Sequence, residues 1–253
     1  MILNAFDLKG KVAIVTGCDT GLGQGMALGL AEAGCDIVGI NIVEPTDTIA
    51  KVEALGRTFL SLKADVSKVD TLPALVDQAV SRFGRVDILV NNAGIIRRED
   101  AINFSEKDWD DVMNINIKSV FFMSQAVARQ FMAQGRGGKI VNIASMLSYQ
   151  GGIRVPSYTA SKSGVMGITR LLANEWASQG INVNAIAPGY MATNNTTALR
   201  ADEDRNAAIL ERIPAGRWGL PDDMMGPVVF LASAASDYIN GYTIAVDGGW
   251  LAR

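Results

Sequence analysis

The sequence predicts a single α/β domain over residues 1–253, with a doubly wound sheet of seven parallel strands and helices on both faces. Short apolar, β-branched runs recur between amphipathic stretches. A glycine-rich loop follows the first run, and no linker, repeat or change of composition divides the chain. The runs are nearly continuous rather than alternating, which is typical of strands buried on both faces. Strand followed by helix, repeated along the chain, predicts a parallel sheet with right-handed crossovers.

A helix is expected after each of the first six strands, and two helices are expected between the last two strands. Ser105 precedes an acidic first turn, and Pro221 with two following aspartates marks another helix start. The longest excursion between elements, residues 189–220, is the expected substrate lid, and we call it the lid segment. Strands are expected at 11–16, 36–41, 59–62, 87–90, 139–143, 182–186 and 243–246, and helices at about 21–33, 46–55, 70–83, 105–134, 157–179, 200–212 and 221–234.

Composition excludes several classes of protein. A net charge of −3 and a pI near 5.1 argue against nucleic acid or an anionic membrane as the main partner. Two cysteines, Cys18 and Cys35, are too few for a disulfide framework, and the absence of histidine leaves no ordinary zinc site. The amino terminus does not resemble a signal peptide, and no apolar run approaches the length of a membrane span. We therefore expect a cytoplasmic protein without a metal.

The glycine-rich loop runs from Thr16 to Gly23, between the first expected strand and the first helix. Glycines there allow a tight turn and close approach of the backbone to a pyrophosphate, while the helix amino terminus supplies N–H donors. This arrangement predicts a Rossmann-type dinucleotide site, although a purely structural turn is the alternative. The loop residues expected to contact the cofactor are Gly17, Thr20, Gly21, Leu22 and Gly23.

Asn41 ends the second strand, where such folds place the side chain that reads the adenosine ribose. An amide can hydrogen-bond ribose hydroxyls, and neither Thr20 nor the residues after Asn41 offer a positive charge for a 2′-phosphate. NAD is therefore favoured over NADP, unless Asn41 is only a strand-end turn residue. Asp65 and Val66, after the third strand, are expected to frame the adenine, or Asp65 to cap a helix.

Tyr158 and Lys162 are the candidates for acid–base chemistry in a chain without histidine. Four residues apart on a helix, they share one face. An ammonium about 4 Å from the phenol favours the phenolate by roughly 4 kcal/mol, which moves the pKa of the tyrosine toward neutrality. By spacing alone, the pair could equally be an ordinary tyrosine and lysine on a helix face.

Together these residues resemble the short-chain dehydrogenase/reductase family, and the resemblance covers essentially the whole chain. Co-occurrence of the motifs in this order is far more specific than any one of them. The motifs are the loop from Thr16 to Gly23, Asn91-Asn92-Ala93-Gly94, Asn116, Ser145, Tyr158 with Lys162, and Pro188-Gly189.

The resemblance implies a role for each motif. Tyr158 is the implied general acid/base, and Ser145 hydrogen-bonds the reacting oxygen. Lys162 lowers the pKa of Tyr158 and holds the nicotinamide ribose, while Asn116 holds a water for proton exchange. Taken alone, Asn116 or Ser145 could satisfy only local structure. The implied cofactor contacts also include Asn92, Ala93 and Gly94 beside the adenosine ribose and Pro188, Gly189 and Thr193 at the carboxamide, and the implied assembly is a homotetramer.

Four runs within the chain resemble family members that act on deoxy keto sugar acids in hexuronate and pectin breakdown. They are 17–21, 94–100, 148–158 and 247–253. A sugar acid needs a cationic partner, and the planar guanidinium of arginine suits a carboxylate. The alternatives are another short-chain reductase, of gluconate, a polyol or an acyl chain, and a catalytically silent nucleotide-binding module. The expected substrate contacts are Arg154 first, then Arg97 or Arg98, with Gln150 and Tyr149 for hydroxyls and Met191 from the lid segment.

Overall fold

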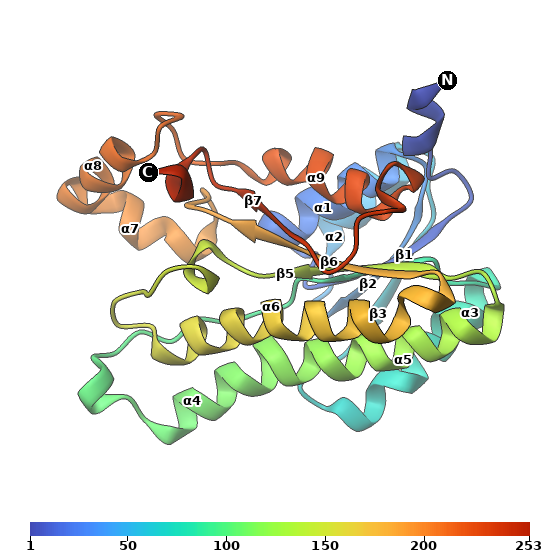
Figure 1. Ribbon diagram of the computed structural model, residues 1–253, viewed down its shortest axis with the longest axis horizontal. Coiled ribbons are helices and arrows are strands. Elements are labelled where there is room, and N and C mark those ends of the chain that lie inside the picture. The colour runs from blue at the N-terminus through green and yellow to red at the C-terminus, as the bar shows by residue number, and fades with distance from the viewer.

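A seven-stranded parallel sheet forms the centre of the computed structural model, which describes all residues from 1 to 253 (Figure 1). The strand order is β3-β2-β1-β4-β5-β6-β7, and every neighbouring pair is parallel. The predicted fold class is therefore confirmed. The strands are β1 (Val12–Thr16), β2 (Asp36–Asn41), β3 (Phe59–Lys63), β4 (Ile88–Asn91), β5 (Gly138–Ile143), β6 (Ile181–Pro188) and β7 (Thr243–Val246).

Helices cover both faces of the sheet, as the strand–helix alternation predicts. In Figure 1, α1, α2 and α9 lie above the sheet, and α3, α5 and α6 lie below it. No helix combines the length and the apolar character needed to cross a membrane. The helices are α1 (Gly21–Glu32), α2 (Thr46–Ala54), α3 (Leu72–Phe83), α4 (Glu106–Met113), α5 (Ser119–Gln134), α6 (Pro156–Trp176), α7 (Thr197–Ala201), α8 (Glu203–Arg212) and α9 (Met225–Ala232).

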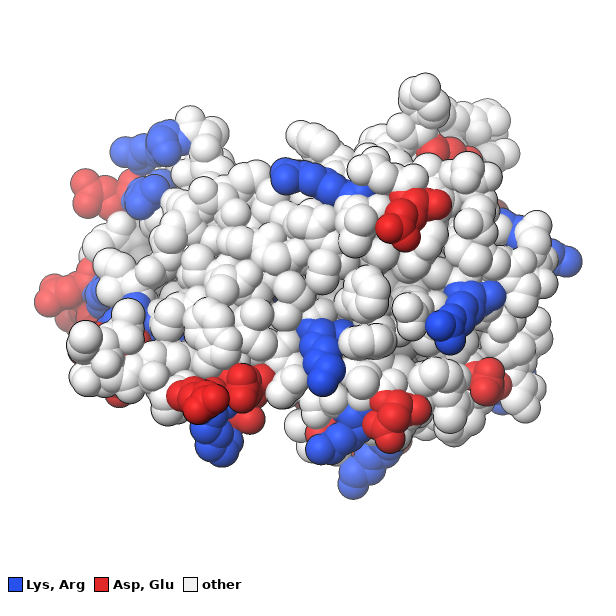
Figure 2. All heavy atoms as spheres, turned by 60° about the horizontal axis from the view of Figure 1, so that its bottom comes forward, with Lys and Arg blue, Asp and Glu red and all other residues white.

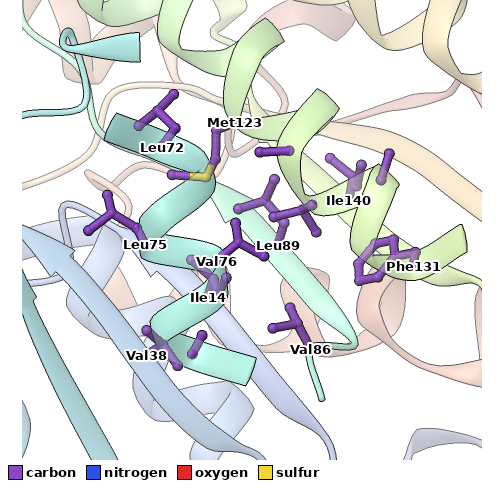
Figure 3. Packing of buried hydrophobic residues seen from close by; sticks show 14 of the residues in the cluster. Ile14, Val38, Leu72, Leu75, Val76, Val86, Leu89, Met123, Phe131 and Ile140 are labelled. Carbon is purple, nitrogen blue, oxygen red and sulfur yellow. The ribbon is translucent and has the colours of Figure 1, made fainter. Parts of the chain in front are cut away.

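Two apolar cores, one on each face of the sheet, hold these layers together. In the lower core, Ile14 and Leu89 from the strands meet Val76 of α3, Met123 and Phe131 of α5 (Figure 3). All five side chains are almost completely removed from water. Because each buried side chain of this size contributes about 1.5–3 kcal/mol, the sheet is a rigid platform for the loops at its edge.

The long helix expected over 105–134 is interrupted. Its first part, α4, begins after Ser105, whose side chain accepts a hydrogen bond from the Asp108 amide at 3.1 Å. A π-helical turn at Asn114–Lys118 then separates α4 from α5. Such a turn inserts a residue into the helix and redirects the side chains around it, and here it carries Asn116. A short 3-10 turn at Ile2–Phe6 was also not anticipated.

The loops that carry the candidate site residues lie together at one edge of the sheet. Since all seven strands are parallel, their carboxyl ends lie together, and the loops after β1, β4, β5 and β6 share that edge. Neighbouring strands β1 and β4 mark the point where the strand order reverses, which is where ligands bind in open α/β sheets. In Figure 1 this edge lies toward α7 and α8.

Gly23 is needed for close packing at this edge. A Cβ atom there would overlap the Gly17 carbonyl oxygen and lie 2.5 Å from Asn92 Nδ2. We expect Gly23→Ala to lower the free energy of unfolding by about 1–3 kcal/mol, because backbone atoms cannot move aside as a flexible side chain can. Urea unfolding measures the change.

A matched control is Gly226→Ala on α9. Position 226 is exposed and has nothing within 4 Å of a built Cβ. Alanine there should leave stability unchanged or raise it by up to about 1 kcal/mol through helix propensity. Equal losses in the two variants would contradict the packing argument.

Candidate active site

The glycine-rich loop is held by hydrogen bonds to the loop after β4. Asn92 Nδ2 donates to the Thr16 carbonyl oxygen at 3.0 Å and to the Gly17 carbonyl oxygen at 2.7 Å. In return, Thr16 Oγ1 accepts from the amides of Asn92 and Ala93, both at 3.0 Å. Thr20, the N-cap of α1, makes no side-chain capping bond, so the first amides of the helix stay available to an anion.

Asn41 holds the same loop from the other side. Its side chain is 4% exposed, and Oδ1 accepts a hydrogen bond from the Cys18 amide at 2.7 Å. Thr48 Oγ1, from α2, donates to the Cys18 carbonyl oxygen at 2.7 Å. The oxygen of Asn41 is therefore committed to the loop. Asn41 is therefore more than a strand-end turn residue, because it supports the glycine-rich loop.

Three charged residues lie near Asn41. Asp19 is half-buried in the glycine loop, and Glu44 accepts a hydrogen bond from the Ser61 hydroxyl at 2.8 Å. Lys63 pairs in register with Asn41 across β2 and β3, is exposed and makes no ion pair. Only the strand register reveals this lysine, 22 residues away in sequence, as a neighbour of Asn41.

Asp65 and Val66 lie on the loop that follows β3, beside the end of β2. Asp65 is exposed, and its Oδ1 accepts from the Ser67 amide at 2.9 Å, as a turn-stabilising carboxylate does. Val66 is only 7% exposed and belongs to the lower apolar core. The expected adenine contacts of Asp65 and Val66 stay a prediction.

Ser145 is anchored to the helix that carries Tyr158. It caps the short turn Met146–Ser148, and its Oγ accepts from the Leu147 amide at 3.1 Å. Ser148 Oγ donates to the Lys162 carbonyl oxygen at 2.7 Å, which ties this turn to α6. The hydroxyl of Ser145 thus has a fixed position relative to α6.

Lys162 is buried, with 4% of its surface exposed. Its Nζ donates to the Ile143 carbonyl oxygen at 2.6 Å and lies 5.7 Å from the centroid of the Tyr158 ring. Burial lowers the pKa of Lys162 to about 8, because the charged form loses its hydration.

Tyr158 is half-buried, and burial raises the pKa of its phenol. The hydrogen-bonding side chain of Ser145 and the positive charge of Arg98 act in the opposite direction and lower this pKa. Lys162 was expected to lower it. In the structure, the Lys162 amine lies over the Tyr158 ring and donates to a backbone carbonyl oxygen, and its effect on the pKa of the phenol stays a prediction.

Asn116 connects the loop after β4 to α6. Its side chain is completely buried, accepts from the Ile95 amide at 2.8 Å and donates to the Ile95 carbonyl oxygen at 2.9 Å. A longer hydrogen bond of 3.3 Å reaches Ser161 Oγ, whose hydroxyl donates to the Tyr158 carbonyl oxygen at 2.9 Å. The side chain therefore satisfies backbone groups while it holds together the segments that carry Gly94 and Tyr158.

The arginines differ in their partners. Arg154, expected first for a substrate carboxylate, places Nε 3.0 Å from Asp100 Oδ1, and its φ of 64° is the only left-handed backbone angle outside glycine. Arg97 lies 3.4 Å from an oxygen of Asp108. Arg98 has no carboxylate partner. Its Nη2 donates to the carbonyl oxygen of Asn195, in the lid segment, at 3.4 Å.

Two further expected substrate residues contact protein groups instead. Met191 is 4% exposed, belongs to the upper apolar core and forms an isolated bridge with Gly219. The side-chain oxygen of Gln150 accepts hydrogen bonds from Trp250 Nε1 at 3.2 Å and Arg212 Nη2 at 3.4 Å. Neither residue is left free to contact a ligand with these groups.

The lid segment begins directly over the glycine loop. Pro188 ends β6, and Gly189 packs so closely on Asp247 that a Cβ would lie 2.7 Å from it. A Cβ built on Gly21 would lie 3.5 Å from Thr193. Thr193 therefore lies beside the helix terminus that is available to an anion.

Comparison with known proteins settles the family. A family model described as enoyl-(acyl carrier protein) reductase matches residues 17–251. The 2-dehydro-3-deoxy-D-gluconate 5-dehydrogenase of Escherichia coli (strain K12) is 81% identical over 253 residues, with complete coverage of both chains. The chain belongs to the short-chain dehydrogenase/reductase family. The family recognition made from the sequence is thus confirmed, and this short-chain dehydrogenase/reductase binds a nicotinamide cofactor.

Two other proteins extend the comparison. The 2-dehydro-3-deoxy-D-gluconate 5-dehydrogenase of Dickeya dadantii (strain 3937) is 79% identical over all of both chains. A crystal structure of a putative 2-deoxy-D-gluconate 3-dehydrogenase from Agrobacterium tumefaciens, with bound NADP, is 56% identical with a TM-score of 0.94. The match covers 99% of this short-chain dehydrogenase/reductase and 100% of that chain.

Sequence reasoning overlooked several parts of this site. Three features depend on tertiary packing and leave no local pattern in the sequence. They are the hydrogen bonds of Asn41 and Thr48 to the Cys18 backbone, the contact of Arg98 with the lid segment, and the contacts around Trp250. One signal was available in the sequence. Glu99 and Asp100 directly follow the arginine pair, so acidic partners for some of these arginines were to be expected.

Proposed function

We propose that this enzyme transfers a hydride between a nicotinamide cofactor and a keto or hydroxy group of a deoxy sugar acid, 2-keto-3-deoxy-D-gluconate, also called 2-dehydro-3-deoxy-D-gluconate. Its place would be cytoplasmic breakdown of hexuronates and pectin. The names of the relatives at 81% and 79% identity support this substrate. The observation that carries the proposal is Arg98, a cation without a carboxylate partner whose charge acts on Tyr158.

Four side chains would do the chemistry. The cofactor, when bound, would supply or accept the hydride. Tyr158 would donate its phenolic proton to the developing alkoxide in reduction and take it back in oxidation, and Ser145 would hydrogen-bond the same oxygen. Lys162 would hold the nicotinamide ribose with Nζ. Asn116 would fix the geometry between α6 and the loop after β4, beside a water that exchanges protons.

Arg98 would bind the substrate carboxylate in preference to Arg154. The Arg154 guanidinium already has Asp100 and Glu99 as partners, at 3.0 and 3.8 Å, whereas Arg98 contacts only a carbonyl oxygen. The negative charges of Asp100 and Glu99 also repel a further anion at Arg154. Arg98 also joins the loop after β4 to Asn195, so a substrate there would lie under the lid segment.

NAD(H) is the proposed preferred cofactor. No basic side chain lies in the loop from Thr16 to Gly23 or in the two residues after Asn41, and Asp19 adds a negative charge there. A 2′-phosphate would be repelled by this carboxylate, whereas a ribose hydroxyl can donate to it. The A. tumefaciens structure contains NADP, so the preference of this enzyme requires its own measurement.

A homotetramer is the proposed assembly. Figure 2 shows uncharged surface between scattered charged side chains on the side that carries α5 and α6. Met132 and Leu171 are 38% and 47% exposed there, beside a hollow of about 270 Å³ that Phe121 and Trp176 also line. An apolar face of this kind favours burial against another copy.

The reaction itself is tested by initial rates. We expect purified enzyme with NAD(H) to favour 2-keto-3-deoxy-D-gluconate over gluconate, polyols and 3-oxoacyl thioesters. Tyr158→Phe should reduce kcat by at least about a hundredfold, the usual loss for a general acid/base, while cofactor binding measured by fluorescence titration survives. Near-normal turnover in this variant, or a better rate on an acyl thioester, would reject the proposal.

The carboxylate partner is tested by a pair of alanine variants. Arg98→Ala should lower kcat/KM for the keto sugar acid by roughly ten- to a hundredfold, because a charge-assisted hydrogen bond contributes about 1.5–3 kcal/mol. A neutral analogue of the same sugar should lose much less. Arg154→Ala is the matched control and should change the rate on the acid by less than about threefold. A larger loss in Arg154→Ala than in Arg98→Ala would restore Arg154 as the anchor.

Cofactor preference is tested by kcat/KM with each cofactor. We expect kcat/KM to be higher with NAD(H) than with NADP(H). Ile42→Arg should lower the ratio of these two values by about tenfold, because the new arginine gives a 2′-phosphate a partner. A preference for NADP(H) in the unmodified enzyme would contradict the proposal and point to Lys63 as the cation responsible. Lys63→Gln would then abolish that preference.

A further inference from the structure

The last four residues of the chain lie against the lid segment and the loop that carries Ser145. After β7, Gly248 and Gly249 adopt φ values of 63° and 91° and turn the chain back. Built Cβ atoms there would lie 2.9 Å from Ile213 and 3.0 Å from Pro214, so only glycine fits this close approach. The turn delivers Trp250 to a position that is 5% exposed.

Trp250 is the centre of an aromatic and cationic cluster. Its ring lies 4.8 Å from the Tyr190 ring, with the planes inclined at 67°, and the Arg212 guanidinium stacks 4.0 Å above it. Tyr190 also contacts Trp218 edge-on at 5.4 Å. Tyr190, Arg212 and Trp218 all belong to the lid segment. Trp250 therefore contacts the segment directly at Tyr190 and Arg212, and Trp218 packs on the other partner of this cluster, Tyr190.

Gln150 connects this cluster to the catalytic loop. Its single side-chain oxygen accepts from Trp250 Nε1 at 3.2 Å and from Arg212 Nη2 at 3.4 Å. Gln150 lies five residues after Ser145, and the intervening turn is capped by Ser145 and bonded to α6. A shift of α8 would therefore displace the Ser145 turn, because the side-chain oxygen of Gln150 links the two.

We propose that Gln150, Arg212 and Trp250 form a positioning cluster that fixes the lid segment relative to Ser145, and so sets the affinity for substrate. The three residues act through the lid segment and not by touching the reacting atoms. The inference rests on the proposed function, in which the lid segment covers a sugar acid. It assigns the carboxyl-terminal turn to substrate recognition, although that turn is remote from the glycine-rich loop in sequence.

Mutation of Gln150 tests the acceptor oxygen. Gln150→Met, which keeps the size but loses the acceptor, should raise KM for the keto sugar acid roughly tenfold and leave kcat and NAD(H) affinity almost unchanged. Gln150→Glu keeps an acceptor for both donors and should hold KM within about threefold. If kcat instead fell by the same factor by which KM rose, Gln150 would act on the reacting groups, and the proposal would be overturned.

A double-mutant cycle separates positioning from direct substrate contact. Arg212→Met alone should raise KM like Gln150→Met, and the double variant should be hardly worse than either, because both remove the same link. If Gln150 contacted the substrate by itself, the two effects would multiply and the proposal would fail. Arg205→Met is the matched control, because Arg205 lies on the same helix but makes no side-chain hydrogen bond or ion pair. It should leave KM unchanged.

Hydrogen exchange gives a readout that needs no substrate. Amides of α7 and α8 should exchange several-fold faster in Gln150→Met and Arg212→Met than in the unmodified enzyme, while amides of α1 stay the same. Unchanged exchange in α7 and α8 would overturn the positioning role. If the enzyme proved inactive on sugar acids but the exchange pattern held, the proposed substrate would be wrong and the positioning cluster would stand.

Discussion

The contact between the loops after β1 and β4 is the constraint on which the site depends. Four hydrogen bonds cross it, from Asn92 and Ala93 to Thr16 and Gly17, and the absence of a Cβ at Gly23 lets the start of α1 come close enough. This contact fixes the first turn of α1 and, through the loop after β4, the segment that Asn116 holds. The glycine-rich loop, α6 and the segment that carries Arg97 and Arg98 thus meet at one junction, at the point where the strand order reverses.

The role of a charged side chain can be inferred only when the groups that already contact it are known. Arg97, Arg98 and Arg154 are equivalent as residue types, but two of them have carboxylates within 3.4 Å and Arg98 has none. An ion pair already formed lowers what a second anion can gain. The pKa of Tyr158 likewise depends on groups from other segments, because burial raises it while the Ser145 side chain and the Arg98 charge lower it.

The fold was largely predictable, because parallel strands and amphipathic helices leave periodic signals that do not need tertiary contacts. All seven strands occur within two residues of their expected bounds. The π-helical turn at Asn114–Lys118 was missed because a one-residue insertion leaves helical periodicity almost intact over a short window. The candidate site was found through motifs. The contacts that Asn41, Gln150 and Met191 make with other protein groups, however, depend on packing between distant segments. No local pattern encodes those contacts.

The low pKa of Lys162 would couple proton uptake to the binding of any ligand that accepts a hydrogen bond from Nζ. Its pKa near 8 in the folded protein, against about 10.5 in the unfolded chain, penalises folding below about pH 8. This penalty disappears as the pH rises toward 10.5, because there the unfolded chain holds a proton that the folded one has released. A ligand whose oxygen atoms accept hydrogen bonds from Nζ would favour the charged amine and raise its pKa. Binding near pH 8 would then draw a fraction of a proton from solution, and affinity would weaken as the medium becomes more alkaline.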